Sequence, residues 1–404
     1  MTQTMSAKRR LTVKKLQETV LSIRKGKFSY TEKEQKKIDF TKYNTAQINE
    51  IADVLEIMRD IVDLSDQRIQ QRIAAAPKGP GRPPAPIKDV MKVQLMETYF
   101  GVSDRVSEGF LRLFREKLGI SSDFSYKTIE RSYDPQRSEE LLDEVFKLTN
   151  EIGNSKEKKF SIDGTGDPCT MKVNYESKRA QQRKQKQTQA GKEKEAGKEK
   201  EAGKEKEAGK EKEAGKEKEA GKEKEDAFPG KKHDFQYSVL SIGTTTKIIG
   251  GFATTDDHSR GELSFFKDVV KETLSNCPRF DTLCGDGIYA NRVACALLEE
   301  PEVTPLFLPK SNVTFRSKGV PLWKSMLYSL ARNPQKWLES YHDRSISETG
   351  NSMLKRREPT KIRKKLSERK GIQEALKFNV HNIRQICYLR YLAPNLLVKS
   401  ILGD

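Results

Sequence analysis

The sequence predicts an α/β protein in which a mixed sheet flanked by helices follows an all-helical N-terminal region. Five short apolar segments are typical of strands, at 159–162, 235–242, 247–253, 280–284 and 303–308. Helical patterns enter this series late, at 261–274, 291–298 and 337–357, which gives the order β-β-β-α-β-α-β-α. Residues 46–149, by contrast, carry only helical periodicity.

The first 86 residues combine basic clusters with one amphipathic helix. Residues 1–45 are basic and could hold two short helices; they form either a partly ordered arm or an arm that contacts DNA. Apolar residues recur at helical spacing over 46–64. The segment 77–86, PKGPGRPPAP, is either a stiff linker or a minor-groove hook centred on Arg82.

Residues 88–149 are expected to form four helices. The first covers 90–100, and three serines are candidate N-caps or openings of the others: Ser103, Ser125 and Ser138. The spacing suits a helix-turn-helix-like reader of DNA, to which Lys127 and Arg131 would contribute contacts. A purely structural helical bundle gives the same pattern, so both interpretations stand.

The charge favours an anionic partner. Lys and Arg number 76 against 58 Asp and Glu, a formal net charge of +18, which favours nucleic acid or an anionic membrane surface. No apolar run of transmembrane length is present, so we expect a soluble, cytoplasmic and nucleoid-associated protein without a membrane partner. The five cysteines form no C-x-x-C pair and are expected to be free thiols.

Residues 190–225 are six copies of AGKEKE. Each copy has two Lys and two Glu, so the repeat is neutral and the basic character belongs to the rest of the chain. The repeat offers no apolar face to pack and a glycine in every unit, which predicts an expanded insertion between the first two strands.

Two aspartates share one context. Asp163 and Asp286 each follow a short apolar run and precede a glycine, which predicts strand ends where Gly164 and Gly287 let the chain turn. Carboxylates at strand ends can converge at one edge of a sheet. Asp167 is close to Asp163, but the following Pro168 favours a turn role for it.

The third carboxylate lies in a polar helical pattern. Tyr341, Arg344, Glu348 and Lys355 are separated by steps of 3, 4 and 7, which on one helix places them along a narrow stripe. Such a stripe is either a solvated face with an Arg344–Glu348 pair or a functional surface.

These residues resemble the insertion-sequence DDE transposases. Tyr341, Arg344, Glu348 and Lys355 match the family signature Y-x-x-R-x-x-x-E-x-x-x-x-x-x-K, and SIDGTG and LCGDGIYANR resemble the segments of its first two catalytic aspartates. The likeness covers most of 80–175 and 230–390. It implies a ribonuclease-H-like fold. Asp286 and Glu348 are 62 residues apart, so members without a large inserted β-domain are the nearer likeness.

The resemblance also implies a mechanism. Asp163, Asp286 and Glu348 would bind two Mg²⁺ or Mn²⁺ ions, which activate water for cleavage at the element's ends and then the freed 3′-OH for joining to target DNA. Tyr341, Arg344 and Lys355 would contact DNA, and a homodimer would hold the two ends. The alternatives are a DNA-binding descendant that no longer cuts and a ribonuclease-H-like nuclease.

The predicted domains are a basic arm (1–45), a helical DNA-binding domain (46–150), a catalytic domain (156–358) interrupted at 190–225, and a basic helical C-terminal region (359–404).

Overall fold

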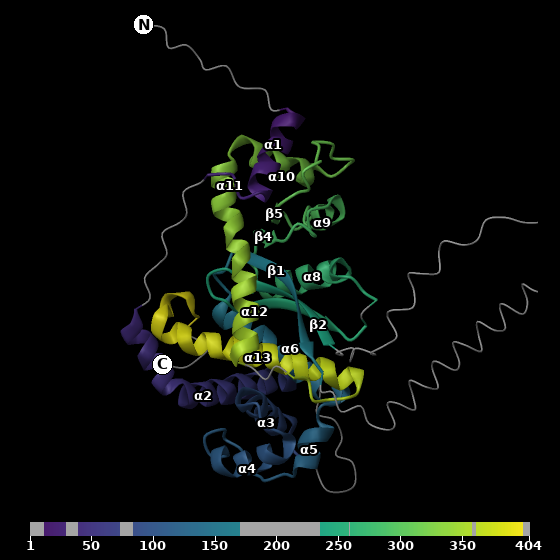
Figure 1. Cartoon of the computed structure of the whole chain (residues 1–404). Helices are drawn as coiled ribbons and strands as arrows, with labels where there is room; N and C mark the ends of the chain where they lie inside the picture. The colour runs from purple at the N-terminus through teal and green to yellow at the C-terminus, as the bar shows by residue number, and fades with distance from the viewer. Residues whose placement is uncertain are drawn as a thin grey trace, which may run out of the picture. The chain divides into compact units, whose positions relative to one another are not determined.

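The computed structural model describes residues 12–29, 39–72, 84–169, 235–257, 259–357 and 361–398. Its elements up to Asp167 and from Phe235 onward belong to one compact unit (Figure 1). Arg82, the AGKEKE repeat and the basic clusters at 8–10 and 36–37 lie outside the described residues. The predicted domain boundaries stay predictions.

The N-terminal part of the described chain is helical, as predicted. Its helices are α1 (Val13–Arg24), α2 (Phe40–Arg72), α3 (Ile87–Phe100), α4 (Asp104–Phe114), α5 (Tyr126–Arg131) and α6 (Pro135–Gly153). The predicted start at Ser138 was wrong, because Pro135 occupies the first turn and the Asp134 side chain accepts from Gln136 N. Ser103 and Ser125 do precede α4 and α5, but their side chains make no capping hydrogen bond.

The sheet has five strands in the order β3-β2-β1-β4-β5. They are β1 (Lys159–Pro168), β2 (Phe235–Gly243), β3 (Ile249–Thr255), β4 (Thr282–Gly285) and β5 (Thr304–Phe307). β1, β4 and β5 run parallel, whereas β2 and β3 pair antiparallel. The prediction of a mixed α/β sheet flanked by helices is therefore confirmed, and every predicted strand is present.

β1 is longer than the sequence suggested. It continues to Pro168, so Asp163 lies within the strand, and the predicted turn at Gly164 was wrong. The turn role of Asp167 was also wrong: its carboxylate is buried in an ion pair with Lys377. This tertiary contact supports a segment, GTGDP, whose composition alone favours a turn.

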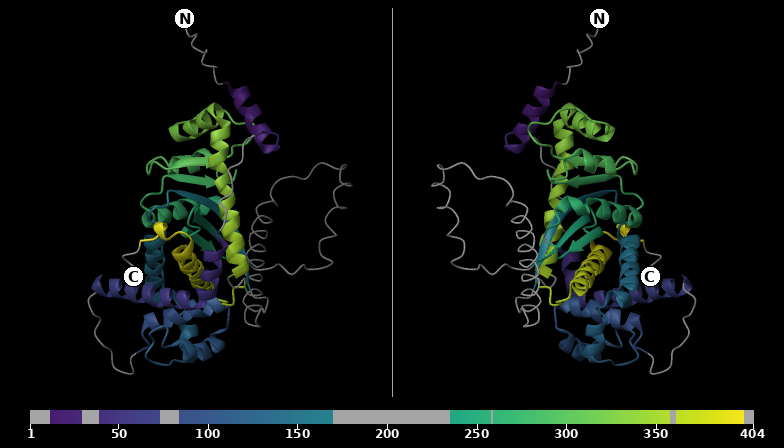
Figure 2. Two further views of the ribbon diagram at one scale, coloured as in Figure 1. Left: turned by 90° about the vertical axis from the view of Figure 1, so that its left-hand side faces the viewer. Right: turned by 90° about the vertical axis from the view of Figure 1, so that its right-hand side faces the viewer.

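Helices cover both faces of the sheet. They are the 3₁₀ segment η1 (Glu262–Phe265), α8 (Phe266–Asn276), α9 (Arg292–Leu297), α10 (Pro321–Arg332), α11 (Pro334–Tyr341), α12 (Ser345–Arg357) and α13 (Ser367–Leu392). Successive side chains of β2 face opposite sides of the sheet and contact different helices. Ser241 Oγ lies 2.5 Å from Thr273 Oγ1 of α8, whereas Ile242 packs against Gly350 of α12. Figure 2 shows α12 along one side of the strands.

The predicted continuous helix 337–357 is two helices. A 3₁₀ turn, η2 (His342–Arg344), separates α11 from α12. Side chains of β1 donate hydrogen bonds to a carbonyl just before this turn and to the carbonyl of its last residue: Lys159 Nζ to Ser340 O (3.4 Å) and Ser161 Oγ to Arg344 O (2.8 Å). Carbonyls engaged in this way are poorer acceptors for the next turn of helix, which gives the interruption a physical cause.

No helix among the described residues has the length and apolarity needed to cross a membrane. All five cysteines are buried and carry thiols rather than disulfides, as predicted.

Candidate active site

The sheet register aligns the segments that carry Asp163 and Asp286. Ile162 of β1 pairs in parallel with Gly285, the last residue of β4. The next residue of each segment is an aspartate: Asp163, which is still within β1, and Asp286, which is exposed just past the end of β4. Neighbouring strands lie about 4.8 Å apart, so the backbones of the two segments are close at this point.

The side of the sheet that Asp163 faces carries α11, η2 and α12. Three alternate residues of β1 contact this segment in turn. Lys159 Nζ lies 2.9 Å from Asp343 Oδ2, Ser161 Oγ donates to Arg344 O, and Asp163 Oδ2 accepts from Asn351 Nδ2 at 3.2 Å. Strand alternation thus fixes α12 over Asp163, and Asn351 orients its carboxylate.

Glu348 lies on α12 near Asp163 but is engaged elsewhere. Its Oε1 forms a 2.9 Å ion pair with Arg344 Nη2, and its side chain is 56% exposed. It lines a groove of about 480 Å³ along α12, whereas Asp286 lines a separate cavity of about 990 Å³. The structure therefore places the three predicted carboxylates on β1, directly after β4 and on the adjoining α12, and does not gather them into one cluster.

The electrostatic environment of Asp163 is acidic. Burial, and next the Glu262 carboxylate, raise the pKa of Asp163 to about 6, and Glu348 adds to the effect. The Gly164 backbone and Arg344 oppose this rise. Glu262 opens η1 and accepts a hydrogen bond from Tyr289 Oη. Unneutralised carboxylates that lie close together favour a cation between them.

The carboxylates of this region form a small donor set for a divalent metal. Among the described residues, no group of three or more His, Cys, Asp or Glu side chains is close enough to hold a metal ion. Asp163 and Asp286 do supply oxygen donors of the kind that Mg²⁺ and Mn²⁺ prefer, and the residues directly before them are paired across the sheet. A third carboxylate ligand would require Glu348 to leave Arg344.

The predicted DNA-contacting residues differ in exposure. Tyr341 is only 8% exposed and its ring stacks on Trp337 at 4.9 Å, with burial raising the pKa of its phenol to about 12. Lys355 is exposed in the last turn of α12. Lys127 and Arg131 are exposed on α5, one turn apart. Arg82 lies outside the described residues.

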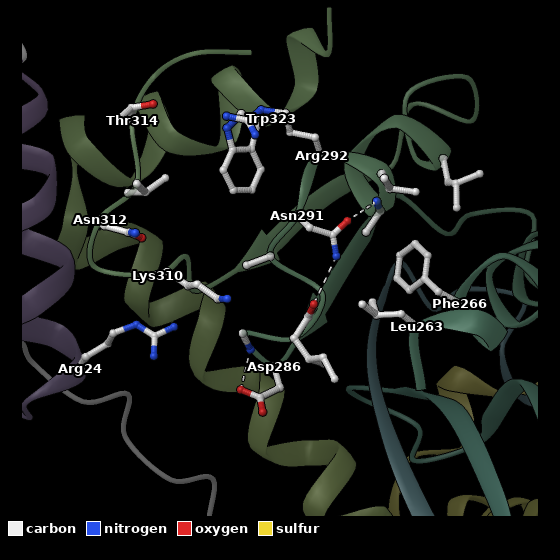
Figure 3. Close-up of a pocket in the computed structure, with 17 residues that line it drawn as sticks. Arg24, Leu263, Phe266, Asp286, Asn291, Arg292, Lys310, Asn312, Thr314 and Trp323 are labelled. Carbon is white, nitrogen blue, oxygen red and sulfur yellow. Dashed lines mark hydrogen bonds between the residues drawn. The ribbon is translucent and has the colours of Figure 1, made fainter. Parts of the chain in front are cut away.

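Three residues of this region were not predicted. Asn351 follows Glu348 by three positions, a helical spacing that places both on neighbouring parts of one face. Glu262 is a lone glutamate before an apolar helix, with no pattern to single it out. Arg24 belongs to the arm, yet it lines the cavity beside Asp286 (Figure 3).

Comparison with known proteins gives one distant similarity. The chain is 25% identical over 269 residues to a protein of Archaeoglobus fulgidus described as "Probable transposase for insertion sequence element ISA1214". The match covers 66% of this chain and 65% of that relative's length. No protein-family model and no solved structure matches the chain.

Proposed function

We propose that this chain is a transposase that binds the ends of its mobile element, cuts phosphodiester bonds there and joins the 3′ ends to target DNA. The observation that carries the proposal is the pairing of Ile162 with Gly285, the residues directly before Asp163 and Asp286, together with the Asn351 hydrogen bond that holds α12 over Asp163. The similarity to a probable transposase of an insertion sequence supports it independently. The basic chain suits a DNA partner.

The proposed catalytic domain is ribonuclease-H-like. The sheet order β3-β2-β1-β4-β5, with a central β1 and parallel β4 and β5, supports this assignment. Asp163 then lies on the central strand, held by Asn351 of α12, and Asp286 directly follows the parallel neighbour β4. Rigid placement matters because a displacement of about 1 Å can cost about 100-fold in rate.

Asp163 and Asp286, with Glu348, would hold Mg²⁺ or Mn²⁺, and the metal would supply an activated water and a stabilised leaving oxygen. The chain's own residues prepare this site. Asn351 fixes one oxygen of Asp163, and Arg344 holds Glu348 on the surface of α12. A DNA phosphate that competes for Arg344 would free the Glu348 carboxylate, which couples DNA binding to completion of the site.

Tyr341, Arg344 and Lys355 are proposed to act along the same helical segment. The Tyr341 ring, buried against Trp337, would position the protein backbone of α11 beside Asp286. Lys355 stands beside Arg356 and Arg357 at the end of α12, which suits phosphate contacts. Lys127 and Arg131 on α5, together with Arg82, are proposed contacts to the element's ends. A homodimer on DNA and association with the nucleoid remain predictions.

The test is cleavage of a labelled duplex that carries the element's terminal sequences, with Mg²⁺ or Mn²⁺. The wild-type chain should nick at the ends, Glu348→Ala should bind without nicking, and Glu300→Ala, an exposed glutamate outside the site, should behave as wild type. Equal nicking by wild type and Glu348→Ala would remove Glu348 from the mechanism.

A second candidate is a transposase-derived protein that binds DNA without cutting it. One observation favours it: Glu348 pairs with Arg344 and is not gathered with the aspartates. Binding of the duplex with no metal-dependent nicking by the wild-type chain would select this alternative.

A further inference from the structure

A cavity of about 990 Å³ adjoins Asp286 and is built from distant parts of the chain. Its wall includes Asp286, Asn291, Lys310 and Trp323 and, from the N-terminal helix α1, Arg24. Figure 3 shows the side chains of Arg24 and Lys310 directed toward the space beside Asp286. The N-terminal arm thus reaches the candidate active site of its own chain.

Helix α1 is anchored on the sheet domain by its apolar face. Leu16 and Val20 are fully buried in the core cluster that also contains Phe307 and Leu327. Gln17 Nε2 donates to Val313 O at 3.0 Å. Burial of this kind fixes the direction of the helix, so the position of its last residue, Arg24, is set by packing.

Arg24 is held by the loop after β5. Its Nε donates to Pro309 O (2.9 Å) and its Nη2 to Leu308 O (3.2 Å). A guanidinium has five N–H groups, so three remain for a ligand. A Cβ at Gly287 would lie 3.0 Å from Arg24 Nη2. The glycine after Asp286 therefore leaves room for the guanidinium, a role that the sequence did not reveal.

The cavity carries an excess of positive charge. Among its lining residues, Arg24, Arg292 and Lys310 are cationic and Asp286 is the anion. Arg292 donates to Arg316 O and lies over the Trp323 ring. Within the described part of the chain, neither Arg24 nor Lys310 forms an ion pair, and the Lys310 ammonium has no hydrogen-bond partner.

We propose that Arg24 and Lys310 form a phosphate-binding site for the DNA backbone beside Asp286, so that helix α1 is part of the active site. The inference rests on the proposed function and identifies a further contact for its DNA substrate. The cavity also exposes apolar side chains, Leu263, Ile288 and Val293. A nucleotide, which has apolar sugar and base surfaces beside its phosphate, fits this lining better than inorganic phosphate does.

The test measures duplex affinity of the full chain against salt concentration, without divalent metal so that no cleavage occurs. Each lost phosphate contact should lower the slope of log K against log salt by about 0.9. We expect this loss for Arg24→Gln and for Lys310→Gln, and retention of the slope for Arg24→Lys. Lys14→Gln makes the same charge change on α1 outside the cavity and is expected to keep the wild-type slope.

An unchanged slope in Arg24→Gln and Lys310→Gln, or an equal change in Lys14→Gln, would overturn the inference and leave the proposed function standing. A wild-type chain that shows the expected slopes but does not cleave with Mg²⁺ or Mn²⁺ would instead overturn only the proposed function.

A free-anion site is tested by replacing chloride with phosphate at constant ionic strength. Duplex binding of wild type and Arg24→Gln should weaken equally. A loss confined to the wild type would identify inorganic phosphate as the ligand and overturn the assignment to DNA. Thermal unfolding of Arg24→Gln shows whether the variant is folded, because the substitution also removes hydrogen bonds to Leu308 O and Pro309 O.

Discussion

Two aspartates of β1, four residues apart, show that the surroundings of an aspartate decide whether it stabilises the fold or is available for chemistry. Asp167 is 2% exposed and its carboxylate is paired with Lys377 of α13. Asp163 is half-buried, accepts from the neutral Asn351 amide and lies near the carboxylates of Glu262 and Glu348. Asp167 is neutralised by the fold, whereas Asp163 lies among like charges that a bound cation would relieve.

The largest effect is expected at Asp163. Asp163→Asn should lower metal-dependent cleavage by at least about 10³-fold, or about 4 kcal/mol, because it removes a proposed metal ligand. Duplex binding and the free energy of unfolding should be unchanged or increased, since a repelling charge is lost. Asp281→Asn, an exposed aspartate before β4, is the matched control. Cleavage within about tenfold of wild type would contradict the assignment of Asp163.

The next effect tests the other aspartate. Lys377→Met leaves the buried carboxyl groups of Asp167 and Glu374 without their cation, so the free energy of unfolding should fall by about 3 kcal/mol. Chemical denaturation measures this change. The double variant Lys377→Met, Asp167→Leu should recover most of the loss because no unpaired charge of the ion pair remains. A single variant as stable as wild type would show that the pair contributes nothing to the fold.

Gly164 offers a way to disturb the surroundings of Asp163 without changing the Asp167–Lys377 ion pair. A Cβ there would meet Tyr237 Oη and approach Glu262 Cδ at 3.2 Å. Gly164→Ala should therefore displace these side chains, lower the free energy of unfolding by about 2 kcal/mol and slow cleavage. Gly166→Ala is the control on the same strand, because its Cβ would meet nothing nearer than 3.8 Å. Equal effects of the two substitutions would show that crowding near Glu262 is not the cause.

The sequence predicted the strands well and placed Asp286 at the end of one of them. Asp286 follows β4 directly, as the pattern indicated, because a short apolar run with a polar end is a local signal. The extension of β1 through Gly164 was not predictable from local composition, since the contact that supports it, Asp167 with Lys377, joins residues 210 positions apart. Propensity yields to tertiary contacts of this kind.

The helix that carries Glu348 shows the same limit. The spacing of Tyr341, Arg344, Glu348 and Lys355 assumed one continuous helix, but the contacts from β1 to Ser340 O and Arg344 O interrupt it. Arg24 was missed because an arm rich in charge gives no sign of where it docks. Helix α10 was not predicted, although Pro321 at its start and apolar residues at helical spacing indicate a helix.

The smallest expected effect is the pH dependence of stability that arises from His381 of α13, the helix that also carries Lys377. His381, one turn beyond Lys377, is buried, and its Nε2 donates to Lys247 O at 2.9 Å. Burial lowers the pKa of His381 to about 4, from 6.5, and the charges of Arg384, Arg357 and Lys377 add to the shift. The unfolded chain therefore binds a proton between pH 6.5 and about 4 that the folded chain does not.

The His381 contribution to stability is thus complete above pH 6.5 and is lost as pH falls toward 4. At pH 5.5 the loss should be about 1.4 kcal/mol relative to pH 8. Burial raises the pKa of Glu97 and Glu272 to about 8, and these groups act in the opposite direction. The measurement is therefore the difference in unfolding free energy between wild type and His381→Gln, in which those groups cancel. A difference that does not change between pH 8 and pH 5.5 would mean that His381 is protonated in the folded chain as readily as in the unfolded chain. The buried environment of α13 would then accept the positive charge of the imidazolium.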